Sequence, residues 1–167
     1  MEYRKLGESG LKVSRLCFGA LTIGPLQAKL SVKDGAALIK RALEGGVNFI
    51  DTAELYNTYS HIAAALKNNR EKVVITTKTY AYTREKAAAS LKRALRELNT
   101  DYIDIFLLHE QESALTLKGH YPALRYLDEA RRRGIIKAVG ISCHTVEAVK
   151  AAMEYEEIKF IHPIFNI

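Results

Sequence analysis

The chain has little cysteine, no long apolar run and no low-complexity segment. Its two cysteines, Cys17 and Cys143, are too few and too far apart for a disulfide framework or a zinc site, so we predict no metal site. No apolar run is long enough to span a bilayer and no signal peptide is recognisable, so we predict no membrane partner and a cytoplasmic location. The 167 residues are 48% hydrophobic, which argues against disorder and is enough for one domain with a core.

The charge balance is basic, since 25 lysines and arginines against 19 acidic residues leave a formal net charge of +6. A basic chain can bind a polyanion, but these residues are spread along predicted helices, as at Lys86, Lys92, Arg93 and Arg96. No motif that reads RNA or DNA accompanies them. We therefore interpret them as solvated helix faces and predict no nucleic-acid partner.

Short, β-branched, almost wholly apolar segments alternate with helical patterns along most of the chain. This alternation predicts parallel strands joined by right-handed helical crossovers. The first 14 residues instead alternate around a turn at residues 7–10, which predicts a β-hairpin. The predicted strands are residues 16–21, 47–53, 73–79, 103–109, 135–142 and 160–166.

Helix signals fill the intervals between these strands. The first helix should begin after Ser31 and end at Gly45, and a short second one should cover about 60–67. The third should begin at Thr83. The fourth should carry Leu124, Leu127 and Ala130 and end at Gly134, and the fifth should begin at Thr145 and bury Val146, Val149 and Met153.

Three of the predicted strands end on or near different reactive groups. Asp51 closes one strand, with Tyr56 five residues on, Lys78 closes the next, and His109 closes the third. If these strands are parallel neighbours, an acid, a phenol, an ammonium and an imidazole meet on one rim, where α/β enzymes keep their chemistry. Residues two apart on a strand share a face. The residues that would point inward below each polar group are therefore the compact, mostly apolar residues of the same strand.

A polar top layer over compact packers favours a closed barrel over a doubly wound open sheet. An open sheet would usually carry a glycine-rich phosphate loop after its first strand, and residues 19–24 match one poorly. We therefore predict an α/β fold, a parallel (βα)8 TIM-type barrel that is incomplete here, with about six βα units. Residues 1–167 would form a single partial domain, with a hairpin cap at 1–15 and the βα units at 16–167.

The four strand-end groups suit one kind of chemistry. A phenol titrates near 10, too high for proton transfer at neutral pH, but a nearby cation lowers its pKa. Lys78 can supply that cation, Asp51 can hold Lys78 by a salt bridge, and His109 can orient a carbonyl oxygen. A tuned phenol that faces a carbonyl and a hydride source gives reversible carbonyl reduction. Because the chain has no two-electron redox group of its own, a hydride cofactor is implied.

These residues, in this order, resemble the aldo-keto reductase family. The run from Gly46 to Tyr56 is similar to its signature, and Lys78 and His109 match the other two members of its tetrad. Residues 3–16 resemble its amino-terminal hairpin and 139–142 its nicotinamide-contacting strand end. The resemblance implies an oxidoreductase that uses NADP(H), with NAD(H) possible, on a (βα)8 barrel of which this is the amino-terminal six-strand portion.

The resemblance also implies roles for individual residues. Tyr56 would be the general acid/base, Lys78 and Asp51 would tune it, and His109 would orient a small aldehyde or ketone. We expect the cofactor at Gly19, Asp51, Ser142, His162 and Asn166.

Some positions depart from the family pattern. Asn57 stands where glycine is usual, Cys143 where asparagine is common, and His162 where glutamine is frequent. These departures resemble a prokaryotic branch in which some members carry a downstream iron–sulfur segment, although this chain has no such cysteine cluster.

Several alternatives stay open. The chain could be a truncated or non-catalytic barrel that binds nucleotide or a partner without turnover. Ser142 could cap a helix instead of contacting a cofactor, and Tyr59, Tyr80 and Tyr82 could line the pocket or cover helix starts. We interpret both cysteines as buried small hydrophobes, Glu110 and Glu112 as solvent-facing, and His61, His120 and His144 as loop residues. Because six strands leave two edges, we expect self-association or completion by further strands.

Overall fold

The computed structural model describes residues 1–7, 9–67 and 69–165. The chain divides into two compact units: unit 1 comprises Met1–Thr77 and Ala94–Asp101, and unit 2 comprises Lys78–Arg93 and Tyr102–Ile167. Strand β5 (Val74–Thr79) and helix α3 (Arg84–Leu98) contribute residues to both units. That the whole chain is one domain stays a prediction.

Unit 1 begins with the predicted hairpin, whose strands pair antiparallel with Tyr3 opposite Ser14. The hairpin is fastened to the segment that enters β4. The Tyr3 hydroxyl donates to the carbonyl of Gly46 at 2.8 Å, while the Asn48 side chain accepts from Ser14 N at 2.7 Å and donates to Lys12 O at 3.0 Å. The elements of unit 1 that precede β5 are β1 (Tyr3–Lys5), β2 (Lys12–Ser14), β3 (Phe18–Gly19), η1 (Ala20–Ile23), α1 (Val32–Glu44), β4 (Phe49–Asp51), η2 (Glu54–Tyr56), α2 (Tyr59–Leu66) and η3 (Arg70–Lys72).

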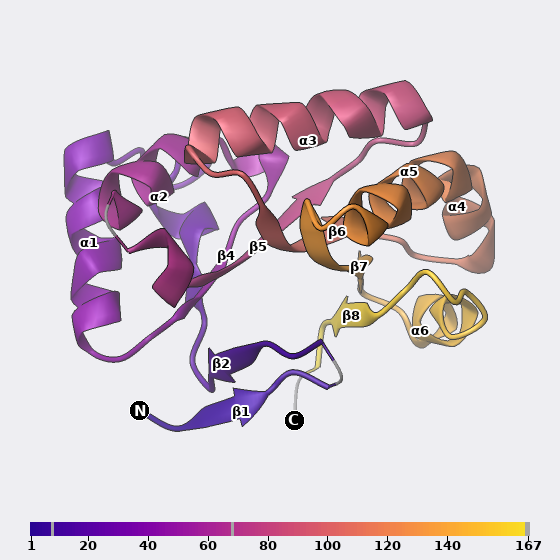
Figure 1. The fold of residues 1–167 in the computed structure, drawn as a ribbon, viewed down its shortest axis with the longest axis horizontal. Coiled ribbons are helices and arrows are strands. Elements are labelled where there is room, and N and C mark those ends of the chain that lie inside the picture. Colours follow the sequence, from indigo (N-terminus) through magenta and orange to yellow (C-terminus); the bar gives the residue numbers. More distant parts are fainter. Residues whose placement is uncertain (8, 68, 166–167) are drawn as a thin grey trace. The chain divides into compact units, whose positions relative to one another are not determined.

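The sheet of unit 1 is parallel, in the order β3-β4-β5. Helix α1 begins where the sequence predicts, since the Ser31 hydroxyl accepts from Asp34 N at 3.1 Å and so satisfies one free amide of the first turn. It ends at Gly45, and Gly46 follows at φ +90°, a conformation that favours glycine. Helices α1 and α2 pack side by side (Figure 1), with Ile39 and Ile62 buried.

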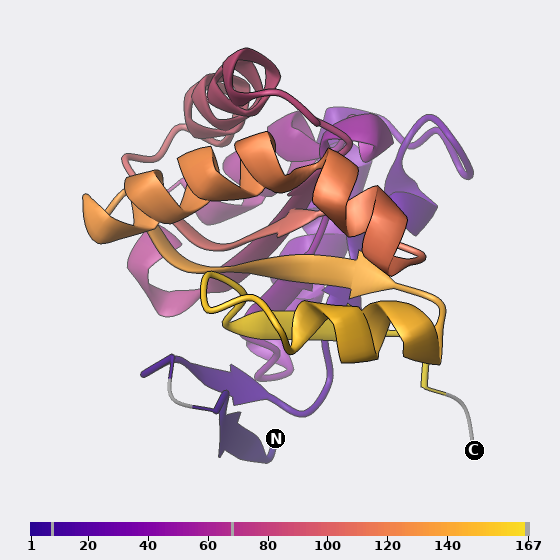
Figure 2. The same ribbon diagram turned by 90° about the vertical axis from the view of Figure 1, so that its right-hand side faces the viewer.

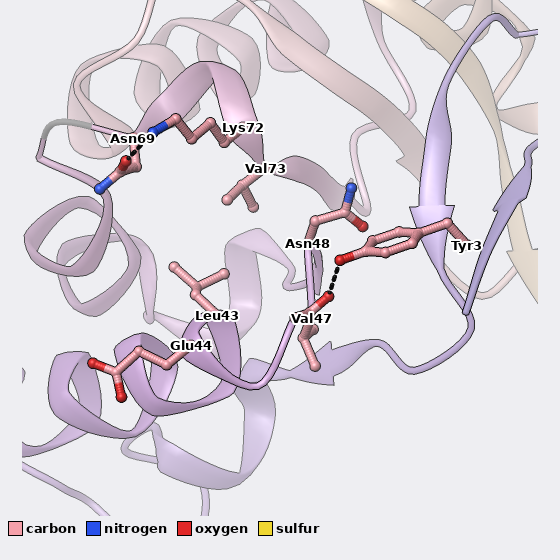
Figure 3. Close-up of a pocket in the computed structure, with 9 residues that line it drawn as sticks. Tyr3, Leu43, Glu44, Val47, Asn48, Asn69, Lys72 and Val73 are labelled. Atoms are coloured by element: carbon pink, nitrogen blue, oxygen red, sulfur yellow. Dashed lines mark hydrogen bonds between the residues drawn. The ribbon is translucent and has the colours of Figure 1, made fainter. Parts of the chain in front are cut away.

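A pocket of about 370 Å³ opens at the amino ends of β4 and β5 (Figure 3). Leu43, Val47 and Val73 give it apolar walls, and the Tyr3 hydroxyl bonds the backbone at its edge. The Lys72 ammonium is already bonded to the Asn69 side chain at 3.1 Å. The pocket lies at the end of these strands opposite Asp51, so it is separate from the predicted rim.

The strands of unit 2 follow in the order β5-β6-β7-β8, and the β6–β7 and β7–β8 pairs are parallel. The amide of His109 donates to Thr79 O at 2.8 Å, which aligns the ends of β5 and β6. Figure 2 shows α5 lying along β7, where Leu124 and Leu127 are fully buried. Besides parts of β5 and α3, unit 2 contains β6 (Ile103–Leu108), α4 (Ala114–Gly119), α5 (Tyr121–Arg132), β7 (Ile136–Cys143), α6 (Val146–Ala152) and β8 (Phe160–Pro163).

Parallel strands that follow chain order, with helices in the crossovers, are the arrangement of a (βα)8 barrel. A doubly wound sheet would double back in its strand order, and neither unit does so. The fold is therefore α/β of TIM-barrel type, with six parallel strands and an amino-terminal hairpin, as predicted.

Two helices differ from the sequence-based prediction. Helix α4 was not expected; its first turn is closed by Ser113 and Thr116, which bond each other's backbone amides. In α6 the buried residues are Ala148 and Ala152, whereas Val146 and Met153 are 71% and 74% exposed. The prediction that Val146 and Met153 are buried was therefore wrong, because large apolar residues do not by themselves fix which helix face meets the sheet.

We predict that Gly140→Ala strongly destabilises unit 2. A methyl group at Gly140 would lie 1.7 Å from the carbonyl oxygen of Phe160, in the neighbouring strand β8. Because backbone cannot yield as a side chain tip can, the strands must separate, and we expect a loss of about 3 kcal/mol or more in the free energy of unfolding. Urea denaturation of the variant is the measurement. Gly119→Ala is the control, since nothing lies within 4 Å of the added methyl.

Candidate active site

Asp51 is the last residue of β4, at the carboxyl end of the sheet in unit 1. It pairs in register with Gly19 on β3 and with Thr76 on β5. Its neighbour Thr52 is fully buried, and the Thr52 amide continues the ladder by donating to Thr76 O at 2.9 Å. The register therefore places the Asp51 carboxyl group at the strand end that the sequence predicts.

Tyr56 ends η2 on a short loop that is held at two points. The buried hydroxyls of Thr52 and Thr58 bond each other at 2.8 Å and so close the loop at its base. Asn57 follows Tyr56 at φ 53°, ψ 40°, the left-handed conformation in which asparagine is the best tolerated residue after glycine. This explains why asparagine can stand where the resemblance leads one to expect glycine.

Gly24 provides the second restraint on the Tyr56 loop. A methyl group there would lie 2.8 Å from the carbonyl oxygen of Tyr56 and 2.6 Å from Thr58 Cγ2. The loop is therefore packed directly against the backbone of residue 24, and the Tyr56 ring is carried by a segment with little freedom to shift.

We predict that Gly24→Ala displaces Tyr56. The extra methyl cannot fit without moving the loop, and misplacing a catalytic group by about 1 Å can reduce a rate about a hundredfold. In a complete barrel that contains these residues, we expect reduced kcat for carbonyl reduction and nearly unchanged cofactor affinity. Gly119→Ala adds a methyl to open space away from the proposed site and serves as the packing control. Full turnover in Gly24→Ala would contradict the rigidity of the loop.

Lys78 and His109 lie at the carboxyl ends of β5 and β6 in unit 2. Both are buried, with 3% and 4% of their surface exposed. Burial is the main cause that lowers the pKa of His109 to about 4, and the charge of Lys78 adds to it. His109 is therefore a neutral imidazole at physiological pH, able to donate one N–H to an oxygen atom.

The loop after β6 is tied to the end of β7. The Glu110 amide donates to the Ser142 hydroxyl at 2.9 Å, and the Gln111 amide donates to Ser142 O at 2.8 Å. The Gln111 side chain donates to His109 O at 3.0 Å, and Gln111 is 1% exposed. Glu110 adopts φ 50°, a strained value for a glutamate. The backbone on both sides of His109 is thus fixed by its neighbours.

Ser142 and His162 are register partners on the neighbouring strands β7 and β8. Helix α6 is capped by Thr145, whose hydroxyl accepts from Ala148 N at 3.1 Å, so capping is not the task of Ser142. The Ser142 oxygen accepts from Glu110 N, which leaves its O–H to donate elsewhere. Asn166, also predicted at the cofactor, lies outside the described residues.

The structure thus gathers the predicted residues in two groups, each within one unit. Gly19, Asp51 and Tyr56 follow the strands of unit 1, and Lys78, His109, Ser142 and His162 follow those of unit 2. That all of them meet on one rim stays a prediction.

Several other polar residues have partners that the sequence did not reveal. His144 Nδ1 lies 2.9 Å from a carboxylate oxygen of Glu112, and His61 is a buried residue of α2 whose Nε2 is 3.1 Å from Leu30 O. Tyr59 is a core residue whose hydroxyl forms a hydrogen bond with Thr77 Oγ1 at 2.7 Å. No spacing rule predicts such long-range pairs.

The two cysteines differ in their surroundings. Cys143 is buried as predicted, and burial together with the Glu112 charge raises the pKa of its thiol. Cys17 is exposed, so its predicted burial was wrong. Across residues 1–7, 9–67 and 69–165, no three His, Cys, Asp or Glu side chains gather as a metal site would require. In the same ranges, no helix is long and apolar enough to cross a membrane.

Comparison with known proteins extends these findings. The family model described as "Aldo/keto reductase family" matches residues 15–166. The aldo-keto reductase YhdN of Bacillus subtilis is 25% identical over all of this chain and 54% of its own length, and the methylglyoxal reductase DkgA of Escherichia coli is 35% identical over 72% of this chain and 44% of its own. A probable voltage-gated potassium channel subunit beta of Arabidopsis thaliana is 30% identical over 76% of this chain and 43% of its own length.

Solved structures agree with this fold. The holo form of aldo-keto reductase AKR11C1 from Bacillus halodurans superposes with a TM-score of 0.85 at 27% identity, over 99% of this chain and 58% of that one. The chain therefore spans about half the length of the relatives it matches. The family model covers nearly all of this chain, and the fold is that of a solved aldo-keto reductase. The chain therefore belongs to the aldo/keto reductase family.

Proposed function

We propose that this chain carries the catalytic residues of an NAD(P)H-dependent reductase of small aldehydes and ketones, which also oxidises the corresponding alcohols. Family and fold indicate an oxidoreductase. The observation that carries the finer proposal is the pair of buried strand-end residues, Lys78 and His109, in which a cation lies near an imidazole that burial keeps neutral. A neutral imidazole beside a cation suits the binding of a carbonyl oxygen better than an exposed, titrating one.

Each residue has one task in this proposal. Tyr56 donates its phenolic proton to the carbonyl oxygen during reduction and accepts it back during oxidation. Lys78 lowers the pKa of that phenol, and Asp51 holds Lys78 in place by a salt bridge. His109 donates its N–H to the same carbonyl oxygen and so fixes the orientation of the substrate.

The cofactor would lie along the strand ends at Gly19, Asp51, Ser142, His162 and Asn166. The residues fit it in two respects: the position of a side chain at Gly19 is open space, and the Ser142 hydroxyl can donate to an amide oxygen. The bound nicotinamide supplies the hydride, which no side chain can supply. We favour NADP(H) and retain NAD(H), and we expect a cytoplasmic protein whose site takes small carbonyl compounds.

The second candidate is a barrel that binds nucleotide and regulates a partner without turnover. The similarity to a protein named as a potassium channel beta subunit favours keeping it. The deciding experiment is a nicotinamide fluorescence titration followed by an aldehyde-reduction assay, both on a complete barrel that contains these residues. Binding with turnover supports the reductase. Binding without turnover for a broad panel of aldehydes and ketones supports the regulatory barrel.

A further inference from the structure

Tyr80 lies next to Lys78 and His109 at the strand ends of unit 2, but the proposed reaction gives it no role. It follows β5 directly, and its ring stacks on the imidazole of His109, with centroids 4.5 Å apart and planes inclined by 27°. His109 is 4% exposed while Tyr80 is 42% exposed, so the phenol ring lies on the outer side and the imidazole beneath it. One face of the His109 ring is therefore covered by Tyr80.

The outer end of Tyr80 is tethered. Its hydroxyl donates a hydrogen bond to the carboxylate of Glu110, the residue after His109. Glu110 is itself held by a hydrogen bond that its backbone amide donates to the Ser142 hydroxyl at 2.9 Å. The Tyr80 side chain is therefore held at both ends. Its backbone follows β5, and its hydroxyl is bonded to the loop after β6.

We propose that Tyr80 is a positioning residue for His109, and that its stacked ring keeps the imidazole in one orientation and shielded from water. The functional part of this inference rests on the proposed reductase, in which His109 donates to the carbonyl oxygen. An imidazole that could turn about its side-chain bonds would spend part of its time with the N–H misdirected. An unshielded one would also be protonated in part at neutral pH.

Several charged groups act on His109 besides the ring that covers it. Lys78 on β5, His144 after β7 and His162 on β8 all lower its pKa, and Glu110 raises it. Burial outweighs them all. Removing the covering ring should therefore raise the His109 pKa from about 4 toward its ordinary value of 6.5, even though every charged neighbour is kept.

The experiment is a histidine-selective NMR titration of a complete barrel that contains these residues, in the wild type, Tyr80→Phe and Tyr80→Ala. The His109→Asn variant identifies the His109 resonance, and carbonyl reduction is assayed in parallel. We expect Tyr80→Phe to keep a low His109 pKa, because the stack survives without the hydroxyl. We expect Tyr80→Ala to raise that pKa by at least about one unit and to lower kcat/KM for the carbonyl about tenfold, with cofactor affinity unchanged.

Tyr82→Ala is the matched control. Tyr82 lies two residues further on, is 49% exposed, and bonds Lys86 instead of the loop after β6, so its loss should leave the His109 pKa unchanged. If Tyr80→Ala does not fold, Tyr80→Leu replaces it. There the upfield ring-current shift of the His109 ring protons, present in the wild type and in Tyr80→Phe, should be lost.

The outcomes separate this inference from the proposed function. An unchanged His109 pKa and ring-current shift in Tyr80→Ala or Tyr80→Leu overturns the positioning role, whatever the activity. A raised pKa in a barrel that reduces no carbonyl compound supports the positioning of His109 and counts against the reductase alone. A raised pKa with a tenfold loss in kcat/KM supports both.

Discussion

Replacement of Tyr56 by phenylalanine is expected to remove most carbonyl reduction in a complete barrel that contains these residues. The phenol is the proton donor of the proposed site, and loss of a general acid lowers a rate about 10²- to 10⁴-fold. The ring itself stays, and its loop is held by the Thr52–Thr58 bond and by Gly24, so the fold and cofactor binding should change little. Single-turnover rates with a nicotinamide cofactor and an aldehyde, alongside a fluorescence titration of the cofactor, give both quantities.

Lys78→Met tests the tuning of that phenol separately. It removes the cation from a position that is 3% exposed, where its effect on neighbouring groups is least screened. If Lys78 lowers the pKa of Tyr56, the variant should be slow and the alkaline limb of its pH–rate profile should move to higher pH.

His109 should add no acid limb near pH 6.5 to the pH–rate profile of the wild type, because its pKa is about 4. Near-wild-type turnover in Tyr56→Phe would falsify the assignment of the proton donor.

The 167-residue chain produced alone is expected to self-associate. In unit 1 the outer strand β3 pairs with β4, and in unit 2 the outer strand β8 pairs with β7, so each unit presents an edge with unpaired backbone groups. Large apolar side chains of unit 2 are also exposed: Leu115 78%, Met153 74% and Phe165 84%. Burying several hundred Å² of apolar surface at about 25 cal/mol per Å² is worth on the order of 10 kcal/mol, as much as a whole domain's stability.

Size-exclusion chromatography with light scattering on the isolated chain measures this association. Val146→Ser with Met153→Ser should weaken it without unfolding unit 2, because both side chains are exposed and the buried face of α6 is made by alanines. Exposed lysines such as Lys150, changed to serine, provide the control for surface substitution. A monodisperse monomer at micromolar concentration that unfolds cooperatively would count against the exposed edges as sites of association.

Much of the fold could be predicted from the sequence because it is encoded locally. Periodicity and caps act over three or four residues, so α1 begins after Ser31 and ends at Gly45 as expected. The strands with reactive ends are short apolar runs bounded by helix signals. Lys78 lies one residue before the end of β5 and His109 directly follows β6, close to where the sequence predicts. Chain order in the sheet follows from the βα alternation itself.

The sequence by itself thus determined the parallel strands, the hairpin and the positions of Asp51, Lys78 and His109 at or next to strand ends, because each depends on neighbours along the chain. Only the tertiary structure decided that α6 buries alanines instead of Val146 and Met153, and that Tyr80 covers His109. It also decided that the loop after His109 is held by Ser142. The last two are contacts between residues about 30 positions apart. No local pattern specifies them, since they arise only when separate strand ends are brought together by packing.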